Sequence, residues 1–210
     1  MPPLQIDTPS GPARAELRAA KGARAALVLG HGAGGGIEAP DLVATAEAAV
    51  GEGFTVALVE QPYKVAGRRS PASAKRLDEA WVAVVEHLRA DELEGLPLVV
   101  GGRSLGARVA CRTLEQTAAD AVLCLAFPLL PPRRGDKPTQ SRLAELEAVD
   151  VPVLVVQGES DRFGMPPEGP RRQVARVPGD HGLKADTNAV ADAVREWLAS
   201  LSLPAGAPGR

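Results

Sequence analysis

Cysteine, aromatic residues and surplus charge are all scarce in this sequence. Its 210 residues include two cysteines and three histidines, 3% are aromatic, and the formal net charge is −2. Cys111 and Cys124 lie in apolar segments, so we expect two buried free thiols and no disulfide. So few cysteines and histidines, without metal-type spacing, predict no metal site and no other cofactor. The near-neutral charge argues against a nucleic-acid partner.

Long hydrophobic runs are also missing. The longest apolar stretch, 118–132, is interrupted by Asp120, Pro128 and Pro131 and is too short to span a bilayer. The N-terminus shows no basic region followed by an apolar run, so no signal peptide is expected. These absences predict a cytoplasmic protein without a membrane partner. The oligomeric state stays open between a monomer and a homodimer.

Short apolar runs alternate with amphipathic segments along most of the chain. We predict a hairpin within 5–17, strands at 25–30, 54–60, 98–101, 121–127, 153–157 and 173–177, and helices at 40–51, 70–89, 105–117, 141–149 and 187–201. This alternation predicts a three-layer α/β/α sandwich with a mostly parallel, doubly wound sheet. We expect one domain over 1–203 and a flexible tail at 204–210. Functional loops should then share the edge formed by the carboxyl ends of the strands.

A glycine-flanked serine lies in the middle of this pattern. The strand at 98–101 runs directly into Gly102-Arg103-Ser104-Leu105-Gly106, and an Ala-rich helix follows. This arrangement is typical of a nucleophile elbow, because a strained turn lifts the hydroxyl above the sheet. The plainer alternative is a serine that caps a helix after a glycine turn. The strand before Ser104 and the helix after it favour the nucleophile.

The expected order on such a sheet is serine, then an acid, then histidine. His181 lies between the last strand and the last helix, where its imidazole can take the proton of Ser104. His87 lies inside an amphipathic helix, so we interpret it as a solvated or half-buried side chain. His181 is therefore the predicted base.

Two acidic residues follow the strand at 153–157. We favour Asp161, because the acid must leave the strand end and turn toward His181. Glu159 lies at the bend itself and is expected to be solvated or bonded to local backbone. Asp180 adjoins His181, but neighbours in a loop rarely form the required hydrogen bond. Asp180 is the weaker alternative.

The glycine-rich segment 30–36 follows the first strand after the hairpin. It lacks the ending of a phosphate-binding P-loop and does not fit a dinucleotide fingerprint. It better fits an oxyanion loop, whose backbone must approach the developing anion within about 3 Å. We therefore predict that the amides of Ala33 and Leu105 form the oxyanion hole. His31 is expected to fix this loop rather than to act as a base, and it is also a candidate substrate-binding residue.

Four motifs together resemble the α/β-hydrolase superfamily in order and spacing. They are His31-Gly32-Ala33-Gly34, Gly102-Arg103-Ser104-Leu105-Gly106, Gly158-Glu159-Ser160-Asp161 and Asp180-His181. The resemblance implies the α/β-hydrolase fold, with a Ser104–His181–Asp161 triad. More narrowly, Gln61-Pro62-Tyr63 and Asp180-His181-Gly182-Leu183-Lys184 resemble the testis-expressed/KANSL-type hydrolase-like family. Dienelactone hydrolases are similar in size, but their nucleophile is cysteine, so Ser104 argues against that activity.

Two short connections set this sequence apart from many relatives. Only 128–150 separates two predicted strands, which is too short for a helical cap domain. Asp161 and His181 are just 20 residues apart, and 164–170 is rich in proline and glycine, so the usual helix there should be lost. Both features predict an open, shallow site. Such a site argues against epoxide hydrolysis, dehalogenation and interfacial activation.

Basic residues cluster in the loops expected at the catalytic edge. They are Lys64, Arg68, Arg69, Arg103, Arg133, Arg134, Lys137, Arg162 and Lys184. The plainer interpretation is that most of them are solvated loop residues without a specific role. The sharper hypothesis is that Arg68, Arg69 and Arg103 recognise a carboxylate or phosphate on a small-molecule acyl substrate.

These motifs predict a serine hydrolase that cleaves a small carboxylic ester or thioester through an acyl-enzyme. The alternative is a catalytically silent binding or scaffold protein on the same fold, because fold alone does not fix function. A serine peptidase is less favoured, since nothing in the sequence resembles an added peptide-gating domain.

Overall fold

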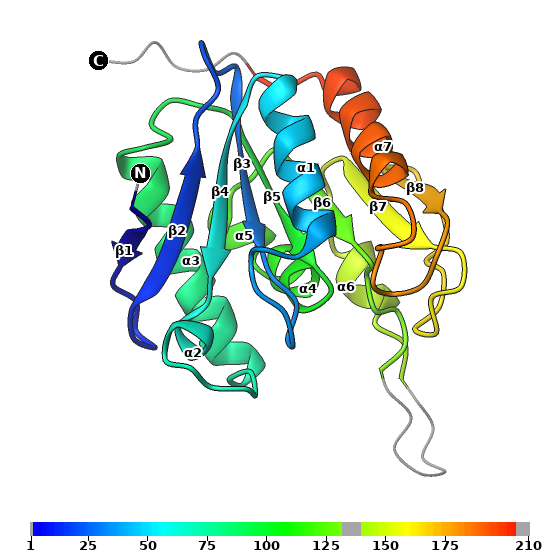
Figure 1. Ribbon diagram of the computed structural model, residues 1–210, viewed down its shortest axis with the longest axis horizontal. Coiled ribbons are helices and arrows are strands. Elements are labelled where there is room, and N and C mark those ends of the chain that lie inside the picture. Colours follow the sequence, from blue (N-terminus) through cyan, green and yellow to red (C-terminus); the bar gives the residue numbers. More distant parts are fainter. Residues whose placement is uncertain (1, 132–139, 205–210) are drawn as a thin grey trace.

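The computed structural model describes residues 2–131 and 140–204, so most of the tail predicted at 204–210 lies outside the described residues. It contains one eight-stranded sheet in the order β1-β2-β4-β3-β5-β6-β7-β8 (Figure 1). The strands are β1 (Leu4–Ile6), β2 (Ala13–Arg18), β3 (Ala25–Gly30), β4 (Phe54–Glu60), β5 (Leu98–Arg103), β6 (Ala121–Leu125), β7 (Val153–Gly158) and β8 (Arg172–Val177). From β4 to β8 all neighbours are parallel, whereas β1 and β2 form an antiparallel hairpin beside β4.

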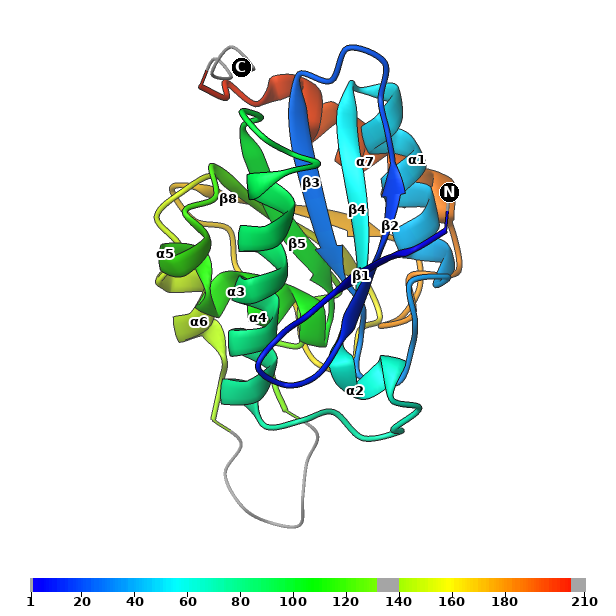
Figure 2. The same ribbon diagram turned by 90° about the vertical axis from the view of Figure 1, so that its left-hand side faces the viewer.

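Helices cover both faces of the sheet (Figures 1 and 2). The helices are α1 (Pro40–Gly51), α2 (Pro62–Val65), α3 (Ala74–Ala90), α4 (Leu105–Arg112), α5 (Leu114–Thr117), α6 (Leu143–Glu147) and α7 (Thr187–Ser200). One buried cluster joins the sheet to α1 and α7, and the other joins it to α3, α4 and α6. This is the predicted three-layer α/β/α sandwich.

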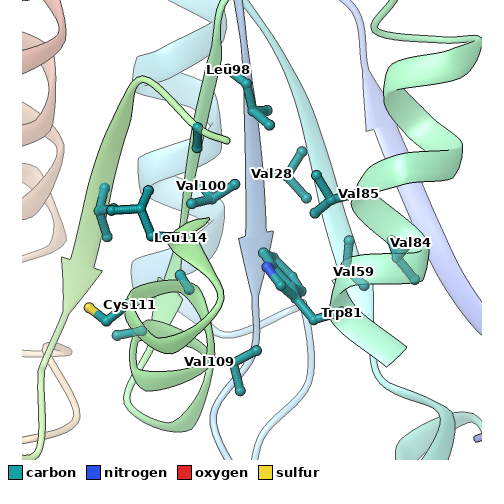
Figure 3. Close-up of a cluster of buried hydrophobic side chains, with 14 of the residues drawn as sticks. Val28, Val59, Trp81, Val84, Val85, Leu98, Val100, Val109, Cys111 and Leu114 are labelled. Atoms are coloured by element: carbon teal, nitrogen blue, oxygen red, sulfur yellow. The ribbon is translucent and has the colours of Figure 1, made fainter. Parts of the chain in front are cut away.

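The central strands are apolar along their whole length because both of their faces are buried. All six residues of β3 and of β7 are buried. Trp81 of α3 is the largest fully buried side chain, and Figure 3 shows it among the valines of its cluster. Cys111 and Cys124 meet in the same cluster as free thiols, with 3.6 Å between their sulfur atoms, as the sequence predicts.

Several element boundaries differ from the sequence prediction. The helix expected at 105–117 divides into α4 and α5 at Thr113, whose hydroxyl donates to the carbonyl of Val109. β6 ends at Leu125 because Ala126 adopts a positive φ of 47°, outside the extended region of strands. The short helix α2 was not predicted, and Pro62 begins it at a position that suits proline.

The connection from β6 to β7 carries only the five-residue helix α6 among its described residues. No helix lies between β7 and β8, and the segment 164–170 forms irregular loop. The described structure thus agrees with the predicted lack of a cap domain. The carboxyl ends of the parallel strands lie at the lower edge in Figure 1, where α2 also lies.

Candidate active site

Ser104 lies on a strained turn between β5 and α4. Its backbone has φ 52° and ψ −100°, and its amide donates to the carbonyl of Leu125 at 2.8 Å. A Cβ added to Gly102 or to Gly106 would lie 2.3 or 2.4 Å from the carbonyl oxygen of Gly30. Both positions therefore require glycine, because α4 crosses directly over the end of β3. This geometry is that of a nucleophile elbow.

The structure brings Ser104, His181 and Asp161 together from three separate segments. His181 Nε2 lies 2.9 Å from the Ser104 hydroxyl oxygen, and His181 Nδ1 lies 2.8 Å from Asp161 Oδ2. An ionised carboxylate can only accept, so Nδ1 carries the proton and Nε2 is free to accept one from Ser104. These contacts fit a Ser-His-Asp triad.

The Asp161 carboxylate is held on both of its oxygens. Oδ1 accepts the amide of Phe163 at 2.8 Å, and Oδ2 accepts the side-chain amide of Gln157 at 2.8 Å. Gln157 is fully buried, and the same nitrogen also lies 3.1 Å from the carbonyl of Phe127 and 2.9 Å from that of Gly164. Sequence analysis overlooked Gln157, although a polar residue in an otherwise apolar strand is a usable signal.

A close backbone approach brings His181 to the site despite the short connection. The amide of Ser160 donates to the carbonyl of Gly179 at 2.9 Å, which ties the acid loop to the histidine loop. A Cβ on Gly158 would lie 2.4 Å from the carbonyl oxygen of Asp180. The end of β7 and the loop after β8 therefore touch, so no helix is needed between Asp161 and His181.

The two alternative acids lie elsewhere in this loop pair. The side chain of Glu159 is exposed to solvent. Asp180 Oδ1 accepts the amide of Gly182 at 2.8 Å, which is a local turn contact. Asp161 is the acid that contacts the imidazole of His181.

The glycine-rich loop after β3 is held by two buried side chains. His31 Nδ1 donates to the carbonyl of Gly32 at 2.8 Å, and its Nε2 accepts the amide of Gln61 at 3.2 Å. Burial lowers the pKa of His31, so the ring stays neutral in this tautomer. The Tyr63 hydroxyl donates to the carbonyl of Ala33 at 3.2 Å, and burial raises its pKa to about 12. Both ring nitrogens of His31 are occupied by backbone, which favours its loop-fixing interpretation over substrate contact.

Within the described residues, the amides of Ala33 and Leu105 donate to no protein acceptor. Leu105 begins α4, where the first amides of a helix lack intrahelical partners. A Cβ on Gly32 would lie 3.7 Å from the Ser104 Cβ, so the loop passes close to the serine. The two amides predicted for an oxyanion hole therefore belong to segments that border Ser104.

The side chain of Arg103 is held by contacts within the protein. Its Nε lies 2.9 Å from Asp41 Oδ2, and its Nη2 donates to the carbonyl of His181 at 2.9 Å. The Asp41 side chain is 1% exposed, and burial raises its pKa against the lowering effect of the Arg103 charge. Arg103 thus links α1 to the histidine loop, and this geometry supports a positioning role better than substrate recognition.

The remaining basic residues of the edge differ in their surroundings. Arg68 and Arg69 are exposed in the loop after α2. The guanidinium carbon of Arg162 lies 4.9 Å from the centre of the Phe163 ring. Arg133, Arg134 and Lys137 lie outside the described residues. Of the arginines predicted to bind substrate, Arg68 and Arg69 therefore remain candidates for substrate contact.

Within 2–131 and 140–204, no group of three or more His, Cys, Asp or Glu side chains could hold a metal ion. No helix of these segments is both long and apolar enough to cross a bilayer.

Comparison with known proteins agrees with this geometry. The family model described as an alpha/beta hydrolase domain matches residues 23–192. XC6422 from Xanthomonas campestris, described as an α/β serine hydrolase without a lid, superposes with a TM-score of 0.72 at 20% identity, over 98% of this chain and 96% of that one. Est1E from Butyrivibrio proteoclasticus gives 0.74 at 18% identity, over 93% and 97%. A dienelactone hydrolase from Anabaena variabilis gives 0.73 at 16% identity, over 93% and 94%.

The match to the family model spans most of the chain, from the start of β3 into α7. At such low sequence identities the solved structures show a shared fold rather than a shared substrate. The elbow at Ser104 and the loops of Asp161 and His181 lie where this fold places its functional residues. The chain belongs to the α/β-hydrolase family.

Proposed function

We propose that this protein is a serine hydrolase that cleaves a small carboxylic ester or thioester through an acyl-enzyme. The observation that carries the proposal is the continuous hydrogen-bond path from the Ser104 hydroxyl through His181 to Asp161, at 2.9 and 2.8 Å. A scaffold protein would gain nothing from keeping this path, from the strained serine or from the two unpaired amides beside it.

The reaction follows from these atoms. Ser104 Oγ attacks the carbonyl carbon while His181 Nε2 takes its proton, and the amides of Ala33 and Leu105 stabilise the oxyanion. The oxyanion collapses, the bond to the alcohol or thiol breaks, and His181 returns the proton to that leaving group. Water then attacks the acyl-enzyme with His181 again as base, which releases the acid and restores Ser104. Asp161 keeps the imidazole in its tautomer and stabilises its charged form.

Fluorophosphonate labelling tests the proposal directly. The wild-type protein should be labelled at one serine, and Ser104→Ala should abolish the labelling. Ser160→Ala is a matched control, because Ser160 is an exposed serine in the acid loop, and it should keep the labelling. Wild-type protein that stays unlabelled would instead support the scaffold alternative.

The exposed arginines in the loop after α2 point to a narrower class of substrate. We propose that Arg68 and Arg69 recognise an anionic group on the acyl part of the substrate. The Arg68 amide donates to the carbonyl of Tyr63, whose hydroxyl holds Ala33, so this loop is tied to the predicted oxyanion loop. The double variant Arg68→Ala, Arg69→Ala should lower kcat/KM for anionic acyl esters and spare neutral ones. Equal kcat/KM for both classes in the wild type would contradict this.

Three finer assignments also remain proposals. The residues Gln61-Pro62-Tyr63 and the segment 180–184 support a place near the testis-expressed/KANSL-type hydrolase-like proteins. The two free thiols support a cytoplasmic location, where thiols stay reduced. Whether the protein is a monomer or a homodimer is a prediction for sedimentation analysis.

A further inference from the structure

We propose that Phe163 and Leu130 form an apolar wall on the leaving-group side of the site, and that the protein prefers esters whose alcohol is apolar. The inference rests on the proposed function and adds the chemical class of one half of the substrate. Its starting point is that both residues belong to loops that meet beside His181, at the carboxyl ends of β6 and β7.

Phe163 contacts the imidazole of His181 directly. The two ring centres are 4.5 Å apart and the planes meet at 73°, an edge-to-face arrangement. The amide of Phe163 donates to Asp161 and the guanidinium of Arg162 lies over the ring, so both backbone and side chain are fixed. Phe163 is half-buried.

Leu130 continues the apolar surface from the neighbouring loop. Its amide donates to the carbonyl of Phe163 at 2.8 Å. A Cβ built on Gly164 would lie 3.7 Å from Leu130 Cδ1, so the leucine side chain lies over the residue next to Phe163. Leu130 is 40% exposed, and it is the one large hydrophobic side chain that stands out as exposed among the described residues. An exposed apolar side chain is common on its own, but here it lies beside the loop whose Phe163 contacts His181.

The chemistry of the reaction assigns this wall to the leaving group. His181 Nε2 must hand its proton to the departing oxygen, so that oxygen lies within about 3 Å of Nε2. The group bonded to this oxygen then lies against the side chains that flank the imidazole, which here is Phe163. The carbonyl oxygen is directed instead toward the amides of Ala33 and Leu105, so the acyl chain does not share the side of the leaving group. An apolar wall at this place favours alcohols that bury methylene groups on leaving water.

Two homologous ester series separate the two halves of the substrate. Acetates of straight-chain primary alcohols lengthen only the leaving group, and ethyl esters of straight-chain acids lengthen only the acyl group. Because alcohol acidity hardly changes along the first series, the rise in kcat/KM reports apolar contact. We expect a rise of about two- to fourfold per methylene in the wild type over the first few methylenes.

Leu130→Ser and Phe163→Ser should flatten the alcohol series while the acyl series keeps its slope. Both series are measured on the same sample of a variant, so the ratio of the two slopes does not depend on the fraction of active protein. Val82→Ser, on the outer side of α3, is the matched control and should retain both slopes.

Each other outcome overturns the inference in a distinguishable way. If the slope of the alcohol series is unchanged in both variants, Phe163 and Leu130 do not contact the substrate. If the variants lose only the slope of the acyl series, these side chains contact the acyl group instead of the alcohol. Labelling by fluorophosphonate without turnover of either series excludes an apolar alcohol ester as substrate. The absence of both labelling and turnover overturns the proposed function as well.

Discussion

Gln157 shows how much of this site depends on a single buried amide. Its side-chain nitrogen faces three acceptors, on Asp161, Phe127 and Gly164, so it ties the acid to the ends of β6 and β7. Its bond to Asp161 Oδ2 reaches the same oxygen that accepts from His181. Gln157 is therefore a positioning residue for the acid, and its effect on His181 passes through Asp161.

Replacement of Gln157 should weaken the nucleophile. In Gln157→Leu the carboxylate loses a charge-assisted hydrogen bond worth about 1.5–3 kcal/mol, so the rate of fluorophosphonate labelling should fall roughly ten- to hundredfold. Gln157→Glu keeps a donor only while the new carboxyl is protonated, and above its pKa two carboxylates repel each other. Its labelling should therefore approach the wild-type rate at acid pH and fall as pH rises. Equal losses in both variants at every pH would reduce Gln157 to a purely structural role.

His31 should make the stability of the protein depend on pH. Burial lowers its pKa below the usual 6.5. Between that lowered pKa and 6.5 the unfolded chain binds more protons than the folded chain, so the free energy of unfolding falls as pH drops through this window. The stabilisation is fully present above 6.5, and its loss is at most about 1.4 kcal/mol per pH unit.

Urea unfolding at several pH values measures this dependence. His31→Gln should flatten the pH dependence of the free energy of unfolding relative to the wild type. His87→Gln is the matched control, because His87 is exposed on α3, and it should leave the dependence intact. A wild-type curve that is already flat below pH 6.5 would contradict the prediction.

At the level of elements, the contact between β7 and the loop after β8 determines where His181 lies. A Cβ at Gly158 would meet the backbone oxygens of Asp180 and Gly179, at 2.4 and 2.7 Å. Backbone cannot move aside as a flexible side chain can, so the histidine loop must shift as a whole. The distance from His181 to Ser104 then changes without any loss of a catalytic group.

Gly158→Ala should therefore strongly reduce activity while the protein still folds. A displacement of about 1 Å at the reacting atoms can cost roughly a hundredfold in rate, so kcat/KM should fall by about that factor. Gly51→Ala, at the end of α1, has open space around its Cβ and should keep full activity. Near-normal kcat/KM in Gly158→Ala would show that the loop relaxes without moving His181.

Local patterns in the sequence predict most elements and the three residues that meet at the site. The strands from β3 to β7 are easy to recognise because they are mostly apolar, and the elbow carries its own glycine signature. What sequence could not provide is contact between distant segments. Ala126 turns out of the strand to donate to Val156, and Arg103 joins Asp41 to the His181 loop. An arginine in the elbow and an acid at a helix start each suggest other roles until the fold brings them together.

On the scale of the whole molecule, the described residues form no cap domain over the catalytic edge. Among the described residues between β6 and β7 the one helix is α6, and the fold resembles that of a serine hydrolase described as lacking a lid. We therefore expect a substrate to reach Ser104 without the movement of a lid. The rate should therefore follow a simple hyperbola with the concentration of a sparingly soluble ester and show no jump at the concentration where micelles form. A jump at that point would indicate interfacial activation.

The outermost strand has a further consequence for how this protein loses activity. Among the described strands, β8 pairs with β7 alone, and Asp161 and His181 lie on the segments that enter and leave it. Sheet margins open at lower free energy than the core. Ser104 and Trp81 belong to the middle of the molecule, so fraying of this one border would separate acid and base from the serine while the interior stays packed. In a Trp197→Phe variant, whose one remaining tryptophan is Trp81, inactivation on gentle heating should thus precede the fluorescence change. The working lifetime would then be set by a border strand rather than by global unfolding.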